Sequence, residues 1–287
     1  MTRKLSLFVY LILKFLDKIF NILTNRSFLS WVKIFLESDS YKSFKLFENN
    51  LVFFVPNQLT EWRVNTFLSK EPETLGWIDS FERKGDLIFW DIGANIGLYS
   101  IYNAIKNKFS KTLSFEPSSS NLRVLSRNIY KNNLTNSITL FPVPLTNKSN
   151  TFLQMNECKF IEGGALNTFG ESFNFEGKNF SPEMKYKTYG TSIDYLLKNK
   201  ILEIPDYIKI DVDGIEHLIL EGGKNSLKDK KIKSILIEIN ENFTEQYEQT
   251  LNLMNLAGFK IQHKKQNSDF ISHNSRFNKT FNYIFNR

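Results

Sequence analysis

Short apolar runs and helix-like segments alternate along the chain from about residue 86 onwards. The apolar runs have the length of buried strands, and the segments between them carry apolar residues at helical spacing. Strands that alternate with helices in this way predict a parallel, doubly wound α/β sheet. The expected strands lie near residues 87–91, 112–116, 138–143, 207–211, 232–239, 259–263 and 280–285, and the expected helices near 97–108, 119–131, 193–198, 215–221 and 244–256.

Residues 144–190 interrupt this alternation. They contain the polar run 147–150, the glycine pair 163–164 and a polar and aromatic stretch from 169 to 180. Irregular segments of this length in a compact domain are usually functional or mobile. We therefore predict an irregular insertion at 144–190, and we expect it to build the substrate pocket together with the N-terminal region.

The N-terminal part of the chain begins with an apolar segment. Residues 5–23 carry apolar side chains at helical spacing, and basic residues flank the most apolar part, 5–13. That part is too short to span a bilayer, which takes about 20 residues, and no small-residue cleavage site follows it, so we expect neither a transmembrane helix nor a signal peptide. The segment is either an amphipathic helix on a membrane surface or a helix packed on the main domain or a partner subunit. We predict an N-terminal extension at 1–84 and the sheet domain at 85–287.

The composition limits the possible folds, compartments and partners, but it does not indicate an activity. A chain of 287 residues with 41% hydrophobic residues can form one large α/β domain with an extension. The single cysteine, Cys158, excludes an intramolecular disulfide and favours a reducing, cytoplasmic compartment. The formal charge of +7 suits several anionic partners, but the lysines are scattered and no nucleic-acid-binding motif accompanies them. We therefore expect no nucleic acid partner.

The most informative segment is the turn between the first strand and the first helix of the sheet domain. Gly93 can adopt backbone angles closed to other residues, and Gly97 lets the helix lie close to the sheet. The start of the helix directs free N–H groups toward a ligand above it. The spacing Asp91-x-Gly93-x-Asn95-x-Gly97 departs from the G-x-G-x-x-G pattern, because the central glycine that admits a pyrophosphate is absent.

A carboxylate follows the next strand at a distance typical of nucleoside sites. Glu116 lies 23 positions after Gly93, and a carboxylate there can accept both hydroxyls of a ribose. With no glycine for a pyrophosphate, this pattern favours a nucleoside cofactor without a diphosphate over NAD or FAD. Asp91 at the strand tip suits a ligand with an ammonium or sulfonium charge. S-adenosylmethionine (SAM) is such a ligand.

A second polar group follows the fourth expected strand. Asp211, Asp213, Glu216 and His217 lie within seven residues, and Asp211 should lie at the carboxyl edge of the sheet, where ligands bind. Either Asp211 or His217 could act as a general base, and the sequence does not choose between them. Asp213 and Glu216 could instead cap the following helix. We expect no metal; the candidate ligands, if one binds, are Asp211, Asp213 and Glu238.

Three segments, 91–100, 115–117 and 209–216, resemble the FkbM-type family of SAM-dependent methyltransferases, and they occur in the family's order. The resemblance extends over about residues 85–262. It implies a Rossmann-like domain with a mostly parallel, seven-stranded sheet, and O-methylation of hydroxyl groups, mainly on sugars or polyketides. With the patterns above, it predicts cofactor contacts at Asp91, Gly93, Asn95, Gly97 and Glu116, and catalytic roles for Asp211 and His217.

The leading hypothesis is a cytoplasmic SAM-dependent methyltransferase that acts on a hydroxyl of a sugar, glycoconjugate or similar small molecule. Peripheral contact with the inner face of a membrane through residues 5–23 is one option within it. The alternatives are a methyltransferase for protein or nucleic acid, and a non-catalytic membrane-associated or interaction protein that retains the fold. The sequence contains no Asn-Pro-Pro-Tyr-type motif for amino methylation, which disfavours nucleic acid methylation. Its intact loop and carboxylates disfavour a decayed site.

Overall fold

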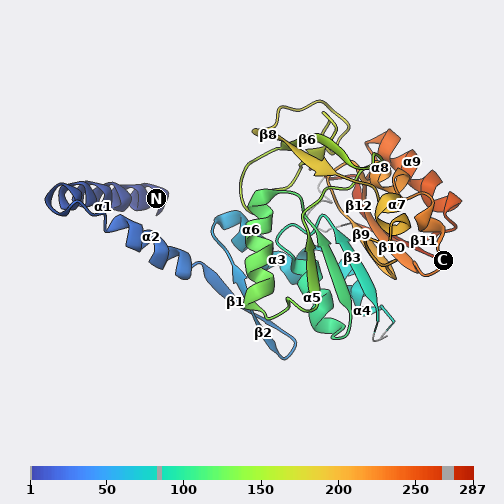
Figure 1. The fold of residues 1–287 in the computed structure, drawn as a ribbon, viewed down its shortest axis with the longest axis horizontal. Coiled ribbons are helices and arrows are strands. Elements are labelled where there is room, and N and C mark those ends of the chain that lie inside the picture. Colours follow the sequence, from blue (N-terminus) through green and yellow to red (C-terminus); the bar gives the residue numbers. More distant parts are fainter. Residues whose placement is uncertain (1, 83–85, 267–274) are drawn as a thin grey trace. The chain divides into compact units, whose positions relative to one another are not determined.

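The protein consists of two compact units, Met1–Pro56 and Asn57–Arg287. The structure, a computed structural model, describes residues 2–82, 86–266 and 275–287 (Figure 1). The domain boundary expected between residues 84 and 85 lies outside the described residues, so it stays a prediction.

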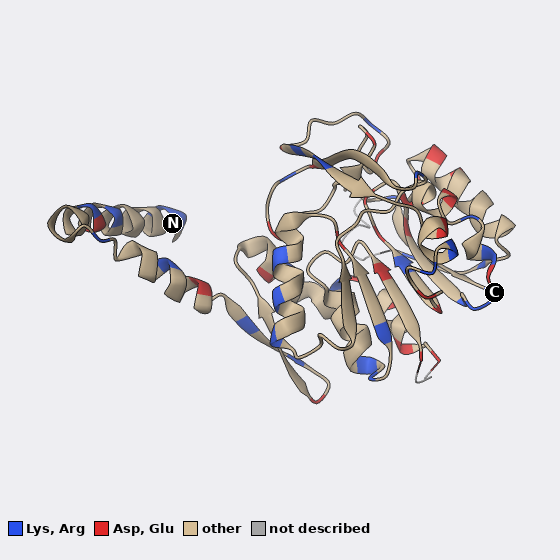
Figure 2. Ribbon diagram, viewed as in Figure 1, with Lys and Arg blue, Asp and Glu red and all other residues tan. Residues whose placement is uncertain are grey.

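The first unit contains two helices and a hairpin. No residue of α1 or α2 is buried, and Figure 2 shows basic residues at several points along α1. Across the described residues, no helix combines the length and the apolar character needed to cross a membrane. The elements are α1 (Thr2–Thr24), α2 (Leu29–Ser38), β1 (Tyr41–Leu46) and β2 (Asn49–Phe54), and β1 pairs antiparallel with β2.

The second unit is built on a seven-stranded sheet with the order β11-β12-β10-β9-β3-β4-β5. Four neighbouring pairs are parallel, and the two pairs that involve β12 are antiparallel. This confirms the predicted Rossmann-like, mostly parallel sheet. Its strands are β3 (Ile88–Ile92), β4 (Lys111–Phe115), β5 (Ile138–Phe141), β9 (Tyr207–Ile210), β10 (Ser234–Asn240), β11 (Lys260–Lys265) and β12 (Thr280–Asn286).

Helices cover both faces of this sheet. The helical elements of the unit are α3 (Gln58–Lys70), α4 (Pro72–Asp79), α5 (Leu98–Lys106), α6 (Ser119–Lys131), α7 (Ile193–Lys198), α8 (Glu216–Glu221), the short 3-10 helix η1 (Ser226–Lys228) and α9 (Thr244–Leu256). Side chains of a strand alternate between faces, and β3 shows the result. Trp90 packs in a buried cluster with residues of α7, α8 and α9, whereas Phe89 contacts Trp77 of α4 and Asp91 contacts Ser100 of α5. The sheet is therefore doubly wound, as predicted.

The segment 144–190, predicted as an irregular insertion, interrupts the alternation of strands and helices but contains regular structure that the sequence did not indicate. This segment forms a three-stranded antiparallel sheet with the order β7-β6-β8, in which β6 is Thr151–Glu157, β7 is Thr168–Phe169 and β8 is Met184–Gly190. One face of β8 is largely exposed, so its polar residues hide the strand pattern in the sequence. Figure 1 shows β6 and β8 beyond one end of the main sheet, near α8.

Candidate cofactor and active site

The loop after β3 contains two glycines whose backbone angles other residues rarely adopt. Gly93 has φ +87°, and a Cβ there would lie 1.8 Å from the backbone oxygen of Asp211. Gly97 has φ +88°, and its Cβ would lie 2.3 Å from Cδ1 of Leu125 in α6. The backbone angle strains a side chain at both positions, and at Gly93 the backbone of Asp211 also leaves no space for one. The loop therefore lies directly against the carboxyl end of β9, where Asp211 begins the next turn.

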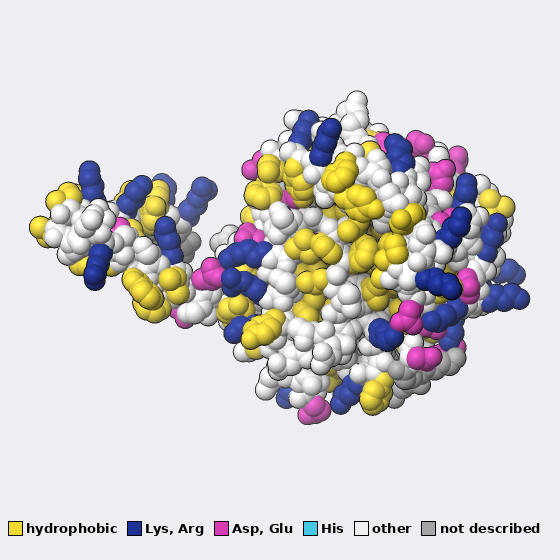
Figure 3. Space-filling model, viewed as in Figure 1, with side chains coloured by type: hydrophobic (Ala, Val, Ile, Leu, Met, Phe, Trp, Pro, Cys, Tyr) yellow, Lys and Arg dark blue, Asp and Glu magenta, His cyan; other side chains and the backbone are white. Residues whose placement is uncertain are grey.

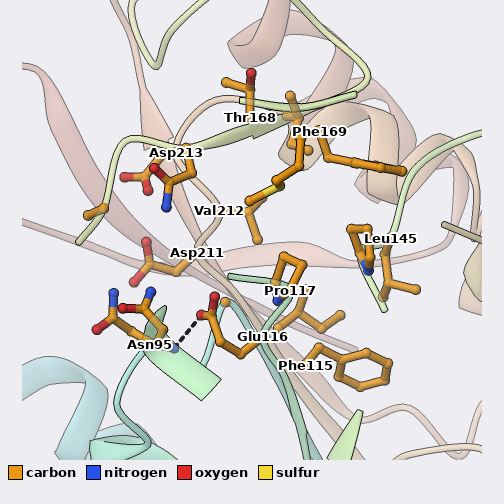
Figure 4. A pocket seen from close by; sticks show the side chains of 18 of the residues that line it. Asn95, Phe115, Glu116, Pro117, Leu145, Thr168, Phe169, Asp211, Val212 and Asp213 are labelled. Atoms are coloured by element: carbon orange, nitrogen blue, oxygen red, sulfur yellow. Dashed lines mark hydrogen bonds between the residues drawn. The ribbon is translucent and has the colours of Figure 1, made fainter. Parts of the chain in front are cut away.

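Glu116 is positioned by two backbone donors. One carboxylate oxygen accepts a hydrogen bond from the N–H of Asn95 at 2.8 Å (Figure 4). The other accepts one from the N–H of Ser118 at 2.9 Å. Burial raises the pKa of Glu116 to about 7, although these two N–H groups favour the ionised form. Each carboxylate oxygen has a second lone pair, so Glu116 can still accept hydrogen bonds from a ligand.

Glu116 lines a cavity of about 580 Å³, which we call the Glu116 cavity. Asn95 and Glu116 lie on one side of it, and Thr168 and Phe169 of the three-stranded sheet lie on the opposite side (Figure 4). The 144–190 segment thus closes the cavity over the ends of the main strands. Predicted site residues that line it are Gly93, Asn95, Glu116, Asp211 and Asp213.

Asp211 is held by a buried lysine. Nζ of Lys209 donates to Oδ2 of Asp211 at 2.7 Å, and the Lys209 side chain is 1% exposed. Burial lowers the pKa of Lys209, but the carboxylates of Asp211 and Asp91 raise it by more, so the lysine stays charged. Oδ1 of Asp211 has no hydrogen-bond partner among the described residues. Asp211 is therefore oriented through one oxygen, and the other is available to a ligand.

Asp213 lies beside Asp211 on the cavity wall (Figure 4). Its Oδ2 accepts a hydrogen bond from the N–H of Leu166 at 2.6 Å. Burial raises the pKa of Asp213 to about 6, and the neighbouring carboxylate of Asp211 raises it further. Asp213 therefore joins the insertion to the turn after β9, and it changes charge at mildly acidic pH.

Three predicted site residues lie apart from the Glu116 cavity. Gly97 packs on α6, as described above. Asp91 is fully buried on the α5 face, where its Oδ2 accepts a hydrogen bond from Oγ of Ser100 at 2.6 Å. Burial raises the pKa of Asp91. His217 lies next to the rings of Phe173 and Phe243, and burial lowers its pKa. The functional roles of Asp91, Gly97 and His217 stay predictions.

Glu216 has a structural position. It accepts hydrogen bonds from the backbone N–H groups of Val212 and Gly214 and from the side chain of Gln246 in α9. Burial raises the pKa of Glu216 to about 7. These contacts hold the turn that carries Asp211 and Asp213. Glu216 lies in the first turn of α8, but the N–H groups of Val212 and Gly214 precede that helix, so the capping role predicted for Asp213 and Glu216 stays a prediction.

A second cavity, of about 460 Å³, shares Gly93, Asn95 and Asp211 with the first. We call it the Arg63 cavity, and sequence reasoning missed its other polar residues. Arg63 and Lys70 both come from α3, and their spacing of seven places them on one helix face. Glu71 matches no motif. Tyr99 and Lys209 lie in the segments 91–100 and 209–216 that resemble the FkbM family, but no role was predicted for either residue. The polar or charged residues that line it are Arg63, Lys70, Glu71, Asn95, Tyr99, Lys209 and Asp211.

The family of the chain follows from a sequence match that includes all the residues lining the Glu116 cavity. A family model described as the methyltransferase FkbM domain matches residues 91–261, from the tip of β3 into β11. The chain belongs to the FkbM methyltransferase family. The resemblance seen in the sequence is thereby confirmed, and the match contains every predicted site residue.

Solved structures of methyltransferases are similar in fold to this FkbM family member. A methyltransferase FkbM from Methylobacillus flagellatus KT has 14% sequence identity and a TM-score of 0.46, and the similarity covers 80% of this chain and 54% of that one. A precorrin-6y C5,15-methyltransferase from Geobacter metallireducens GS-15 has 15% identity and a TM-score of 0.42, and the similarity covers 76% of this chain and 86% of that one. M. capricolum TrmK, solved with S-adenosyl-homocysteine, has 16% identity and a TM-score of 0.42, and the similarity covers 74% of this chain and 66% of that one. No curated protein matches the chain. The family assignment therefore rests on the sequence match.

SAM is the cofactor of this methyltransferase family member, and the site has groups that suit it. Glu116 offers a carboxylate for ribose hydroxyls. Oδ1 of Asn95 is buried and has no hydrogen-bond partner among the described residues, while Nδ2 of the same side chain donates to the carbonyl of Gly164 at 2.7 Å. That contact fixes the amide orientation, since a flipped amide would place two carbonyl oxygens together. Asn95 Oδ1 is thus an acceptor that awaits a donor from a ligand.

The predicted metal candidates do not form one group. Glu71, Asp211 and Glu238 place carboxylate oxygens within 4.8 Å of one another, whereas Asp213 does not join them and Glu71 was not predicted. Burial raises the pKa of Glu71, but Lys70 and Lys209 lower it to about 2, and burial raises the pKa of Glu238 well above its ordinary value. Lys70 and Lys209 therefore already balance the charges of Glu71 and Asp211, and the carboxyl group of Glu238 favours its neutral form.

We expect removal of divalent metals to have no effect on this FkbM family member. Dialysis against EDTA should leave the thermal unfolding temperature and the affinity for SAM unchanged, because lysine side chains already balance the carboxylates. Thermal unfolding with and without added Mg²⁺ or Mn²⁺ checks this. A metal-dependent stabilisation that disappears in Glu238→Gln would instead identify a metal site.

Proposed function

We propose that the protein is an O-methyltransferase that transfers the methyl group of SAM to a hydroxyl of a sugar, glycoconjugate or similar small molecule. The observation that carries this proposal is Asp211. Its free Oδ1 lies on the wall of the same cavity as Glu116, so a base lies within reach of a ligand bound there. A hydroxyl needs such a base because it must lose its proton as the new bond to carbon forms.

The chain's own residues supply orientation and proton transfer. SAM, when bound, supplies an electrophilic methyl group on a sulfonium. Glu116 would hold the ribose, and the loop from Gly93 to Asn95 would hold the cofactor near Asp211. Lys209 holds Oδ2 of Asp211, so the free Oδ1 accepts the hydroxyl proton. Placement of acceptor and base in one cavity removes much of the entropic cost of a bimolecular reaction.

The insertion provides the wall opposite the cofactor loop. Met155 of β6 and Phe169 of β7 line the Glu116 cavity, and both are buried. Their apolar surfaces exclude water, which strengthens the interactions of Asp211 and Glu116 with a bound ligand. A small acceptor that enters between this wall and Asp211 would be sheltered from solvent during transfer.

The acceptor class can be tested with the purified, full-length protein. We would supply SAM with a ¹³C-labelled methyl group and compare mono- and disaccharides, glycolipids, a peptide mixture and RNA. The proposal expects release of S-adenosylhomocysteine with a sugar, and a product whose labelled carbon is bonded to oxygen in NMR spectra. A product whose labelled methyl carbon is bonded to nitrogen or to carbon would contradict the proposal. Turnover with only peptide or RNA would also contradict it.

We also propose that α1 binds an anionic membrane surface. Phe8, Phe15 and Leu23 are 61%, 64% and 77% exposed, and basic and hydrophobic side chains share the surface of α1 (Figure 3). The one acid of the helix, Asp17, accepts hydrogen bonds from Ser27 and from the N–H of Leu29 at the start of α2. The remaining charges are positive and suit anionic headgroups. They belong to Arg3, Lys4, Lys14 and Lys18.

Deletion of residues 1–24 is expected to abolish binding to phosphatidylglycerol vesicles and to leave SAM affinity unchanged. Reversal of two charges, Lys14→Glu with Lys18→Glu, should weaken vesicle binding at least about tenfold, since each basic residue near the surface contributes about 1 kcal/mol. Vesicle sedimentation and calorimetric titration measure the two quantities. Retained vesicle binding after the deletion would contradict the proposal, and a misfolded deletion variant would favour a helix packed on the main domain.

A further inference from the structure

Among the residues that line the Arg63 cavity, three are cationic and two are acidic. The charge of Arg63 also lowers the pKa of Asp213, which lines the neighbouring Glu116 cavity. Nζ of Lys70 lies 2.8 Å from Oε1 of Glu71, and Lys209 is paired with Asp211. Arg63 has no ion pair with any of the described residues. Its Nε donates to the carbonyl of Gly163 at 2.7 Å, so the half-buried guanidinium is held in place by one nitrogen. Its two terminal nitrogens are left for an anion.

The fixed position of Arg63 depends on the same segment that holds the cofactor loop. The carbonyl of Gly164 accepts hydrogen bonds from Nδ2 of Asn95, at 2.7 Å, and of Asn121, at 3.1 Å. The N–H of Gly163 donates to Oδ1 of Asn121 at 2.9 Å. Residues 163–164 thus connect Arg63 to Asn95 through backbone atoms. The guanidinium therefore has a defined place relative to the loop.

The two cavities meet at Gly93, Asn95 and Asp211. A ligand whose ribose lies on Glu116 can extend past these residues into the Arg63 cavity. SAM has an α-carboxylate at the end opposite its adenosine, and a guanidinium with two free nitrogens matches a carboxylate in charge and in planar geometry. We infer that Arg63 binds the α-carboxylate of the methionine part of SAM.

This inference rests on the proposed methyltransferase function, through SAM, but not on the identity of the acceptor. The amino acid end of SAM also carries an ammonium group, and the same cavity provides an acceptor for it. Asn95 lines the cavity, and its Oδ1 has no partner among the described residues. The Arg63 cavity therefore offers a cation for the carboxylate of an amino acid and an acceptor for its ammonium group.

Three ligands separate the carboxylate from the rest of the cofactor. S-adenosylhomocysteine, its decarboxylated 3-aminopropyl analogue and 5′-methylthioadenosine share the adenosyl group and a neutral sulfur. We expect the wild-type, full-length protein to bind S-adenosylhomocysteine about ten- to a hundredfold more tightly than the decarboxylated analogue, as expected for a hydrogen-bonded ion pair. Calorimetric titration measures the dissociation constants of all three.

Arg63→Gln is the decisive variant. The amide nitrogen of glutamine takes the place of Nε and can still donate to Gly163, so the substitution removes only the charge and the terminal nitrogens. We expect it to erase the preference for S-adenosylhomocysteine and to change the affinity for 5′-methylthioadenosine less than twofold. Arg123→Gln, which removes an exposed arginine paired with Glu162 on the same segment, is the matched control and should retain the preference.

Two results would overturn the inference. A wild-type protein that binds S-adenosylhomocysteine and the decarboxylated analogue equally has no carboxylate site, whatever the variants do. An Arg63→Gln protein that keeps the preference places the carboxylate elsewhere and leaves Arg63 for the acceptor. A wild-type protein that binds none of the three ligands contradicts the methyltransferase function itself, which is a different failure.

Discussion

Asp211→Asn is expected to lower the turnover number about a thousandfold and to change the affinity for SAM less than tenfold. Asparagine has the shape of aspartate but cannot take the hydroxyl proton, and a positioned general base contributes about 10²- to 10⁴-fold to rate. Single-turnover rates, measured on a sugar acceptor that the wild-type protein methylates, give the loss in the chemical step. Calorimetric titration with SAM separates that loss from weaker cofactor binding.

His217→Gln is the comparison that decides between the two predicted bases. His217 packs between aromatic rings and lines neither cavity within the described parts of the chain, so we expect its loss to change turnover less than threefold. Asp211→Asn also leaves buried Lys209 without its closest carboxylate, although Asp91 and Glu71 stay near it. Thermal unfolding of both variants shows whether the fold is retained. A large loss in His217→Gln with normal turnover in Asp211→Asn would reverse the assignment.

The central part of the fold could be predicted from the sequence because the signals there are local. The apolar strand, the glycines at 93 and 97 and the acid at 116 each reflect a requirement within a few residues. Gly93 and Gly97 illustrate this, since both adopt a positive φ that other residues rarely take. The insertion was different, because β6, β7 and β8 pair across turns whose glycine and asparagine residues resemble an irregular loop.

The site was less predictable than the fold. Side chains alternate between the two faces of a strand, and this alternation, together with contacts between residues distant in sequence, decides which acids face the cavities. Asp91 stands at the tip of β3, as a ligand contact would, but its side chain points to Ser100 in α5. Arg63 lies in α3 and Glu71 lies between α3 and α4, before the first strand of the main sheet, and only the folded chain brings them to Asp211. No local pattern encodes such a contact. The charge balance that distinguishes Arg63 from Lys70 was invisible in the sequence for the same reason.

Glu116→Gln is expected to weaken SAM binding about a hundredfold at pH 8. Hydrogen bonds to a charged group contribute about 1.5–3 kcal/mol, and the variant loses the charge that the ribose hydroxyls would share. Glutamine also has only one oxygen for the N–H groups of Asn95 and Ser118, so one of these donors loses its partner. Calorimetric titration measures the change. Glu157→Gln removes a buried acid outside the Glu116 cavity and is the matched control, with an expected change below threefold.

The pH dependence of binding identifies Glu116 independently. Because burial raises its pKa to about 7, the ligand-free protein carries a protonated Glu116 below that pH and an ionised one above it. The ribose hydroxyls and the positive charge of SAM favour the ionised form, so affinity should rise with pH and then level off above pH 7. Below pH 7 the dissociation constant should increase up to about tenfold per pH unit. In Glu116→Gln the affinity should no longer change with pH around pH 7, and a smaller dependence should remain near pH 6, where Asp213 titrates. An unchanged profile in the variant would show that another group controls binding, because a side chain that no longer titrates cannot produce it.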